Sequence, residues 1–465
     1  MKKVFFSLLF SGIMFFAGCV QEPTETILVN ASPVLQLNSN ENKHLEQLHD
    51  YDTPYTVCYK NKNQTYTMYI FSSPIQYSID EGIYTMIDNT VVTAKKDSFA
   101  FENKSNIIKT YFPKTLLEPF RIENGTDFME VQINWNVEGF SQAEKTIFTN
   151  MYGDMVSGVI YKRDDCVLVF YPTKAGIKLE IVLNKRPDSN IFSFLVNTNT
   201  SSYENKQNGY ILLKEGGENK SIIYNPLVQY TLDGEQQLDV TTQIKADRKE
   251  GDTIVSLILE EDILDSKSTA FPIRLDPSFE MYLNKMPDST VYKKNNINNY
   301  LATNAIIGEH PVYGEGWHYL RFRLNYYMTQ PPKNLLSAKY RVKKLYANND
   351  TAELLLRQPM DQWSSTRLTW LNRMEAQELD CAYSCTFTPQ NWCEIDMTSF
   401  VQECLSDQSQ LCESIGLILS LEQDTSEYII FAASDNALYT PYMELTFSEL
   451  PLEFKNIGTI NDVIE

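Results

Sequence analysis

The 465-residue chain is predicted to be all-β. Short runs rich in Val, Ile, Tyr, Phe and Thr recur along it, such as "TYTMYIF", "CVLVFY" and "IKLEIVL", and runs of this length and composition are typical of strands. Gly, Asn, Asp and Pro separate them, as in "NKRPDSN" and "KEGGENK", which favours antiparallel strands joined by hairpins. Aromatic residues make up 12% of the chain, and 28 of them are tyrosines, which suits β-rich architecture.

The first residues read as an export signal. Lys2 and Lys3 precede an apolar run over residues 4–16, and Ala17 and Gly18 then stand before Cys19. The run is too short to span a bilayer, and small residues before a cysteine suit cleavage by lipoprotein signal peptidase. We therefore predict a signal peptide over residues 1–18, a lipidated Cys19 and an extracytoplasmic protein held to a bacterial membrane by its lipid alone. The alternative is an ordinary cleaved signal followed by a coincidental cysteine, since a Phe stands where Leu is commonest.

The mature part divides into four segments. Residues 19–50 are polar and aperiodic, which predicts a flexible tether. Residues 51–275 hold the first set of strands and end at "STAFPIRLDPSF", where two prolines resist a central sheet position. Residues 276–448 hold the second set, and residues 449–465 form an acidic tail. Short helices are expected only near residues 141–150 and 398–405.

Charge and cysteine content narrow the function classes. The formal net charge is −20, and loss of the two signal lysines makes it more negative, so we expect no nucleic-acid partner. Five cysteines fall close together in an extracytoplasmic chain, which predicts one or two local disulfides rather than a zinc site, because their spacing is irregular and no histidine is nearby. These disulfide candidates are Cys381, Cys385, Cys393, Cys404 and Cys412.

The second half resembles the DNRLRE domain, a jelly-roll-like β-sandwich classed with the family-96 carbohydrate-binding modules. The resemblance rests, in order, on "NNYLATNAIIG", "YLRFRL", "LLSAKYRVKKLYA", "DQWSSTRLTWLNR", "WCEIDMTSFVQEC", "GLILSL" and "PYMELTF". It implies a polysaccharide or cell-surface glycan as the partner.

The first half resembles the region ahead of this sandwich in secreted, wall-associated RHS-type proteins. The matching stretches are "MYIFSSPIQYSIDEGIYTMIDNTV", "GVIYKRDDCVLVFYPTKAGIKLEIVL" and "FPIRLDPSF". The long tyrosine-rich repeats that follow in those proteins are absent here, so the resemblance implies a surface-facing head and puts a toxin-shell function in doubt.

Catalytic signatures are missing from the sequence. It has no zinc-protease helix, no Gly-x-Ser-x-Gly elbow and no phosphate-binding loop, and its four histidines leave a serine or cysteine nucleophile little choice of base. A pair of carboxylates with glycosidase chemistry stays open, because such a pair is defined by its spacing in space. We predict that the chain is not an enzyme.

Two features could bind a glycan. The loop "GEHPVYGEGWHY" holds Tyr313, Trp317 and Tyr319 among glycines, and flat aromatic rings stack on the C–H faces of sugars. The alternative is that Trp317 folds back to cap the core.

The second feature is a row of cations on neighbouring strands, which would suit acidic glycans such as those with uronic acids. The alternative is that Asp and Glu on adjacent strands pair with these cations. The cations are Arg321, Arg323, Lys339, Arg341 and Lys343. The other tryptophans are expected to be buried.

The sequence thus predicts a non-catalytic cell-surface lipoprotein whose C-terminal sandwich binds a carbohydrate. The alternative is a structural or adhesive surface protein that binds another protein and is related to the head of RHS-type proteins. No cofactor is expected. Asn-rich turns such as "KKNNINNY" and "YANNDTAE" could present oxygen ligands to a structural calcium, although they are more often plain turns.

Overall fold

The computed structural model describes most of the chain between residues 44 and 450. The described residues are 28, 30, 44–80, 82–206, 210–233, 235–239, 242–249, 252–265, 269–283, 288–300, 302–321, 334–349, 354–361, 363–378, 386–387, 392–406, 416–421, 426–436 and 438–450. The predicted signal peptide and Cys19 lie outside them, as does almost all of the acidic tail. Within the described ranges, no helix is both long and apolar enough to cross a membrane.

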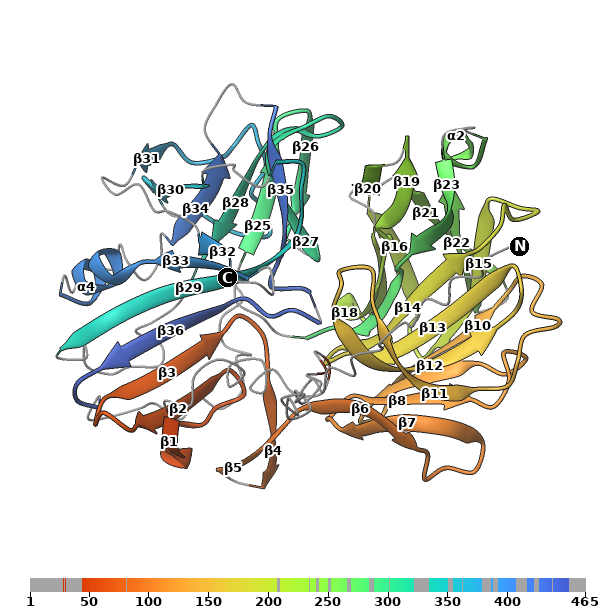
Figure 1. The fold of residues 1–465 in the computed structure, drawn as a ribbon, viewed down its shortest axis with the longest axis horizontal. Helices are drawn as coiled ribbons and strands as arrows, with labels where there is room; N and C mark the ends of the chain where they lie inside the picture. The colour runs from red at the N-terminus through yellow and green to blue at the C-terminus, as the bar shows by residue number, and fades with distance from the viewer. Residues whose placement is uncertain are drawn as a thin grey trace, which may run out of the picture.

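The structure is almost entirely antiparallel β, as predicted, and consists of two sandwiches side by side (Figure 1). The N-terminal sandwich packs an eight-stranded sheet against an eleven-stranded one. In spatial order the first holds β21 (Thr242–Lys249), β22 (Asp252–Leu259), β15 (Ile191–Thr198), β10 (Asp127–Ile133), β9 (Phe120–Asn124), β8 (Lys109–Pro113), β7 (Phe99–Ser105) and β6 (Asp88–Thr93). The second runs through β11 (Glu144–Thr149), β12 (Met155–Lys162), β13 (Cys166–Pro172), β14 (Gly176–Leu183), β24 (Ser278–Met281), β18 (Glu218–Tyr224), β17 (Tyr210–Glu215) and β16 (Ser202–Lys206), with β19 (Val228–Leu232), β20 (Glu235–Asp239) and β23 (Thr269–Leu275) attached.

The C-terminal sandwich is built from one continuous network of fifteen strands. Its main path runs through β1 (His44–Gln47), β2 (Thr56–Asn61), β3 (Tyr66–Phe71), β36 (Tyr442–Phe447), β29 (Leu335–Ala347), β35 (Tyr428–Ala432), β27 (Asn304–His310), β28 (Gly314–Leu320), β34 (Leu417–Leu421), β30 (Leu354–Pro359) and β31 (Ala376–Glu378). Branching from it are β25 (Asp288–Tyr292), β26 (Asn295–Asn299), β32 (Thr386–Phe387) and β33 (Trp392–Asp396). The long strand β29 pairs with β33 and β36 along its first part and with β35 along its last, so it joins the two layers.

Five short elements complete the described structure. The strands β4 (Gln76–Asp80) and β5 (Ile83–Met86) form a separate two-stranded ribbon, and a 3-10 turn, η1 (His49–Tyr51), follows β1. The helices are α2 (Glu261–Asp265) and α4 (Thr398–Ser406), the second of which matches the helix expected near residues 398–405. The helix expected near residues 141–150 is wrong: β11 lies there, because its alternating side chains pair with β12 along its whole length.

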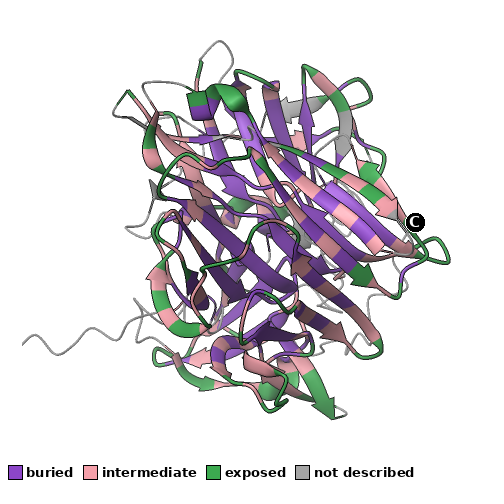
Figure 2. Ribbon diagram, turned by 90° about the vertical axis from the view of Figure 1, so that its right-hand side faces the viewer, coloured by how far each residue is buried: buried purple, intermediate pink, exposed green. Residues whose placement is uncertain are grey.

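Strand alternation places the core of each sandwich. In β22, Thr253, Val255, Leu257 and Leu259 are buried while the residues between them are partly exposed, as expected for a strand with one face on the core. Figure 2 shows buried residues running along the strands of this sandwich, with exposed residues gathered in the connecting turns. The hydrophobic cores therefore lie between the layers of each sandwich.

The structure corrects the predicted domain boundaries at both ends of the N-terminal domain. Strand β3 pairs with β36 from Tyr66 opposite Phe447 to Phe71 opposite Tyr442, so residues 44–71 belong to the C-terminal sandwich. Conversely, β24 pairs with β14 and β18 and belongs to the N-terminal one, although it follows residue 276. Pairing between distant segments decides both boundaries, and composition carries no sign of it.

The predicted tether over residues 19–50 is also docked in part. Asn30 is buried, and its amide donates to the carbonyl oxygen of Ser157 (2.8 Å) while its Oδ1 accepts from the Ser157 N–H (3.0 Å). Its backbone oxygen accepts from the Asn89 N–H (2.9 Å). These hydrogen bonds attach Asn30 to the N-terminal sandwich, whereas β1 at the other end of the segment joins the C-terminal sandwich.

The two sandwiches share a buried interface. A hydrophobic cluster contains Met151, Tyr171 and Leu227 from the first and Leu438 and Tyr439 from the second. Across the same interface, the Lys343 ammonium lies 2.7 Å from the Asp154 carboxylate, and the Tyr439 hydroxyl donates to Asp154 at 2.6 Å. Apolar packing and a buried ion pair therefore hold the sandwiches in one arrangement.

Candidate functional site

The aromatic loop predicted around Trp317 is a hairpin whose rings mostly turn inward. Strands β27 and β28 pair from Gly308 opposite Gly316 to His310 opposite Gly314. Trp317 is only 7% exposed, and Tyr319 is fully buried. The structure therefore corrects the expectation that these two rings project into solvent and places them in the core, as the alternative for Trp317 proposed.

Neighbouring side chains cover the Trp317 ring. It packs edge-on against Trp370, with ring centres 5.5 Å apart, and the guanidinium groups of Arg357 and Arg373 each lie 5.0 Å from its centre. Its Nε1–H donates to Glu315 at 3.0 Å. Trp363 and Trp370 belong to the same buried cluster, as predicted. A ring that is only 7% exposed and whose polar atom is engaged offers no platform to a sugar.

The cations of the predicted basic face are paired with carboxylates. Lys339 and Arg341 reach Glu394 on the neighbouring strand at 2.5 and 2.7 Å, and Arg341 also reaches Glu444 at 3.1 Å. Lys343 is buried in the interface with Asp154. The described part of this face therefore offers no cationic row to an acidic glycan. The structure agrees instead with the alternative, in which carboxylates pair with these cations.

The remaining predicted residues lie elsewhere. Arg321 donates to the Trp363 carbonyl at 2.7 Å and covers that indole ring, while Arg323 lies outside the described residues. Cys393 is disulfide-bonded, and the side chains of Cys381, Cys385, Cys404 and Cys412 are outside the described part. The two free cysteines in the described ranges are Cys58 and Cys166, both buried.

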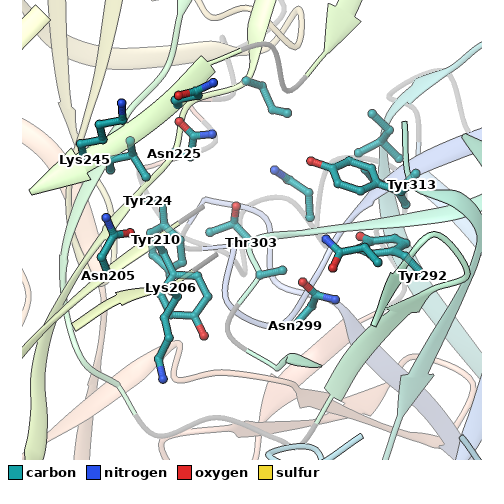
Figure 3. A pocket seen from close by; sticks show the side chains of 18 residues that line it. Asn205, Lys206, Tyr210, Tyr224, Asn225, Lys245, Tyr292, Asn299, Thr303 and Tyr313 are labelled. Atoms are coloured by element: carbon teal, nitrogen blue, oxygen red, sulfur yellow. The ribbon is translucent and has the colours of Figure 1, made fainter. Parts of the chain in front are cut away.

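A cavity of about 630 Å³ lies where the two sandwiches face each other (Figure 3). One wall comes from β16, β17, β18 and β21, and the other from β25, β26 and the β27–β28 hairpin. Tyrosines and side-chain amides dominate the lining, and Tyr313 is the one predicted glycan-binding residue among them. These residues are Tyr210, Tyr224, Tyr292, Tyr313, Asn205, Asn225, Gln243, Asn295, Asn299 and Asn304.

Stacked rings build the C-terminal wall. Tyr313 lies parallel to Tyr292, with ring centres 4.9 Å apart, and to His310, at 5.1 Å. His310 and Tyr292 are buried, whereas Tyr313 is partly exposed, and Figure 3 shows its hydroxyl pointing toward the opposite wall. Burial raises the pKa of the Tyr292 hydroxyl, which stays protonated. The stack holds Tyr313 in one orientation at the edge of the cavity.

Asn304 supplies a polar group to the same space. Its Oδ1 is buried and makes no hydrogen bond within the described structure. Buried polar atoms are nearly always hydrogen-bonded, so an unpaired acceptor beside a cavity is a place where a ligand O–H or N–H fits. Asn299 differs, because its amide donates to the Thr290 carbonyl at 2.8 Å and so braces β26 against β25.

The lining lacks the groups that hydrolysis needs. Among the described residues that line the cavity there is no Asp, Glu or His, so no pair of carboxylates faces the space. In the described part of the chain, no group of three or more His, Cys, Asp or Glu side chains is placed to hold a metal ion. The cavity can stack rings and exchange hydrogen bonds with a hydroxyl-rich molecule.

Sequence reasoning missed most of this site. The Asn-rich run "KKNNINNY", which carries Asn295 and Asn299, is predicted to be a turn with a conceivable role in calcium binding, and Tyr292 and Asn304 are not singled out. The opposite wall comes from residues between 205 and 245. The density of Asn beside Tyr in "VYKKNNINNYLATN" was the available signal. No sequence feature indicated the residues of the facing wall, because only the docking of the two sandwiches brings them to the cavity.

Comparisons with known proteins give a family match for residues 280–447. No curated protein matches the chain. One solved structure, the N-terminal domain of the Streptococcus gordonii adhesin Sgo0707, aligns at 8% identity and a TM-score of 0.16, covering 88% of this chain and 94% of that one, which is too weak to carry an argument. Residues 280–447 match the model of carbohydrate-binding module family 96, so this part of the C-terminal sandwich is similar to a carbohydrate-binding module.

Proposed function

We propose that the chain is a non-catalytic cell-surface lipoprotein that binds a glycan, and that the cavity between its two sandwiches is the binding site. The observation that carries this proposal is the partly exposed Tyr313 ring, backed by Tyr292 and His310 and set beside the unpaired Asn304 Oδ1. A sugar presents an apolar face to an aromatic ring and hydroxyl groups to amides, and this lining offers both. The family-96 match supports carbohydrate as the ligand class.

The non-catalytic part of the proposal rests on the chemistry of the lining. Glycoside hydrolysis needs two carboxyl groups on either side of the bond that breaks, and the described lining holds none. The lipid anchor at Cys19 rests on the sequence alone. Retention on the membrane through this lipid would leave the cavity facing the surroundings of the cell.

The test is a glycan array followed by calorimetric titration with the soluble chain from residue 20. We expect one class of oligosaccharide to bind, and Tyr313→Ala to weaken that binding about fivefold, since an aromatic contact is worth about 1 kcal/mol. Asn304→Ala should weaken it as well. Tyr84→Ala, a partly exposed tyrosine on the separate β4–β5 ribbon, is the matched control and should bind as wild type does. Equal binding by wild type and Tyr313→Ala would remove the cavity from consideration.

A second function, adhesion to another protein, is favoured by the β4–β5 ribbon. A two-stranded ribbon is marginal by itself, and this one carries Ile79 and Ile83 at 62% and 54% exposure. If the array shows no glycan binding by the folded chain, this ribbon is the first surface to test against candidate protein partners, with Ile79→Ser and Ile83→Ser as variants.

A further inference from the structure

A buried group of charged residues lies on the outer face of β14, under the interface between the sandwiches. Lys178 and Glu180 alternate with core residues along this strand and so point away from the core toward the second sandwich. Asp276 comes from the bend between β23 and β24, both of which pair with β14. Three side chains with acid and amine chemistry are thereby collected at one place, and all three are buried.

Asp276 is held with its carboxyl group beside the Lys178 amine. The Lys178 Nζ lies 2.7 Å from the Asp276 Oδ2, and the two side chains are only 10% and 2% exposed. The backbone N–H of Leu227 donates to Oδ1 at 2.7 Å, and the Tyr152 hydroxyl donates to Oδ2. Hydrogen bonds to both oxygens draw electron density from the carboxyl carbon and are placed to stabilise negative charge that develops on either oxygen.

Glu180 supplies a proton-carrying group next to this pair. It is fully buried; its Oε1 accepts from the Met151 N–H at 2.9 Å, and its Oε2 has no hydrogen-bond partner within the described structure. Burial raises the pKa of this carboxyl to about 7, although Arg274, 3.7 Å away, and Lys178 oppose the rise. A carboxyl that is half protonated near neutral pH can both take up and give a proton.

From this geometry we infer that Lys178 and Asp276 join in a covalent amide, an internal cross-link between β14 and the β23–β24 bend. Glu180 takes a proton from the Lys178 ammonium, and the neutral Nζ attacks the Asp276 Cγ to form a C–N bond. One C–O bond of the carboxyl then breaks, and its oxygen leaves as water with protons from Glu180 and from Nζ. The atoms balance: one amine and one carboxylic acid give one amide and one water, without oxidant or cofactor.

Two physical effects favour the reaction here. Fixing the amine and carboxyl in contact replaces a bimolecular encounter with an intramolecular one and so removes part of the entropic barrier to the reaction. Exclusion of water favours the amide, because water is the product, and removes the hydration that otherwise stabilises the ion pair.

The chain holds a second buried pair that serves as an internal control. Lys343 and Asp154 are also 2.7 Å apart, but the Asp154 side chain is 17% exposed and so keeps contact with water. It accepts from the Tyr439 hydroxyl and, within the described structure, from no backbone N–H. No amide is expected there. The comparison therefore shows whether a short distance between Lys and Asp is sufficient for the cross-link or whether the full arrangement around Asp276 is needed.

The test is the intact mass of the soluble chain from residue 20 after denaturation and reduction of disulfides. We expect wild type to be lighter than its sequence by one water molecule. Protease digestion should give a branched peptide that joins the Lys178 and Asp276 segments, with no tryptic cleavage after Lys178, because the amidated side chain carries no charge. The Lys343 and Asp154 segments should appear as separate peptides.

Variants assign the roles. Lys178→Arg and Asp276→Ala should show the full sequence mass, and Glu180→Gln, which keeps the shape and removes the acid, should lose all or most of the cross-link. If freshly purified wild type has the full sequence mass and keeps it after prolonged incubation at neutral pH, the proposal is overturned. This outcome is measured on the wild-type protein, so it does not depend on whether any variant folds. A cross-link that forms in Glu180→Gln as completely as in wild type would overturn the role given to Glu180.

Discussion

At the scale of single residues, the structure changes what a Trp317 substitution can report. The ring fills a buried cluster with Trp363 and Trp370, so Trp317→Ala should lower the free energy of unfolding by about 3–5 kcal/mol through lost burial and the cavity left behind. Denaturant titration of the full chain measures this loss. A glycan-binding defect in this variant would then reflect unfolding, whereas a fully stable variant would show that the ring is not packed as described.

A second residue-scale prediction concerns pH. Burial opposes ionisation of Glu123, but hydrogen bonds from Lys96 and Arg121 outweigh it and lower the pKa of this carboxyl. The stabilisation is therefore present above the ordinary pKa of Glu and is lost as pH falls through the lowered value. Glu123→Gln should cost about 1 kcal/mol at pH 7, since the site is partly solvated, and less at pH 3, which lies below the ordinary pKa of Glu. Urea titrations at the two pH values check this; an equal cost at both would exclude a charge effect.

At the residue scale, the sequence predicts correctly which side chains share one face of a strand. It does not predict which residues of other strands lie opposite them. The alternation of Lys339, Arg341 and Lys343 was read correctly, since these three lie on one face of β29. Glu394 and Glu444, the partners of Lys339 and Arg341, come from strands 50 or more positions away, and the register that pairs them is set by the fold. The same reason hid Asn304 and the facing wall of the cavity.

At the scale of elements, strand β36 explains why the C-terminal sandwich needs the N-terminal end of the chain. It pairs on one side with β29 and on the other with β3, and Met68, Ile70, Met443 and Leu445 share the core of this sandwich. The family-96 match begins at residue 280 and so leaves out three strands that this sheet contains. The composition of each segment predicted strands well, because local alternation suffices for that, but it could not assign a strand to a sheet.

The missing strands lead to a prediction about fragments. A fragment of residues 276–448 should be poorly folded and prone to aggregate, because β36 becomes an exposed edge and the apolar side chains that β3 covers are uncovered. A chain in which residues 44–75 follow residue 450 through a flexible linker restores this pairing and should show a cooperative thermal transition. Circular dichroism melts of the two chains decide the question. A fragment that melts as cooperatively as the extended chain would mean that β1–β3 add little.

At the scale of the whole molecule, the binding cavity exists only because the two sandwiches are docked. Its walls come from different sandwiches, so any movement between them changes the distance from Tyr313 to the wall that carries Tyr210 and Tyr224. The docking rests on the apolar cluster around Tyr439 and on the Lys343–Asp154 pair. Stability of the interface and ligand affinity should therefore change together.

Asp154→Ala tests this coupling. It removes the carboxylate that lies 2.7 Å from the Lys343 ammonium, which is 2% exposed, and removing one member of a buried pair typically costs about 3–5 kcal/mol. Calorimetry should show one unfolding transition for wild type, and for the variant a lower melting temperature or two separate transitions, together with weaker glycan binding.

Glu144→Ala is the matched control for that substitution. Glu144 pairs with Lys162 at 2.6 Å on the outside of the N-terminal sandwich, where both side chains are about half exposed, so its loss should cost less than about 1 kcal/mol and leave binding unchanged. If Asp154→Ala costs no more than Glu144→Ala, the ion pair does not hold the sandwiches together. If instead it costs several kcal/mol and leaves glycan binding intact, the ligand does not depend on both walls of the cavity, and the site must lie within one sandwich.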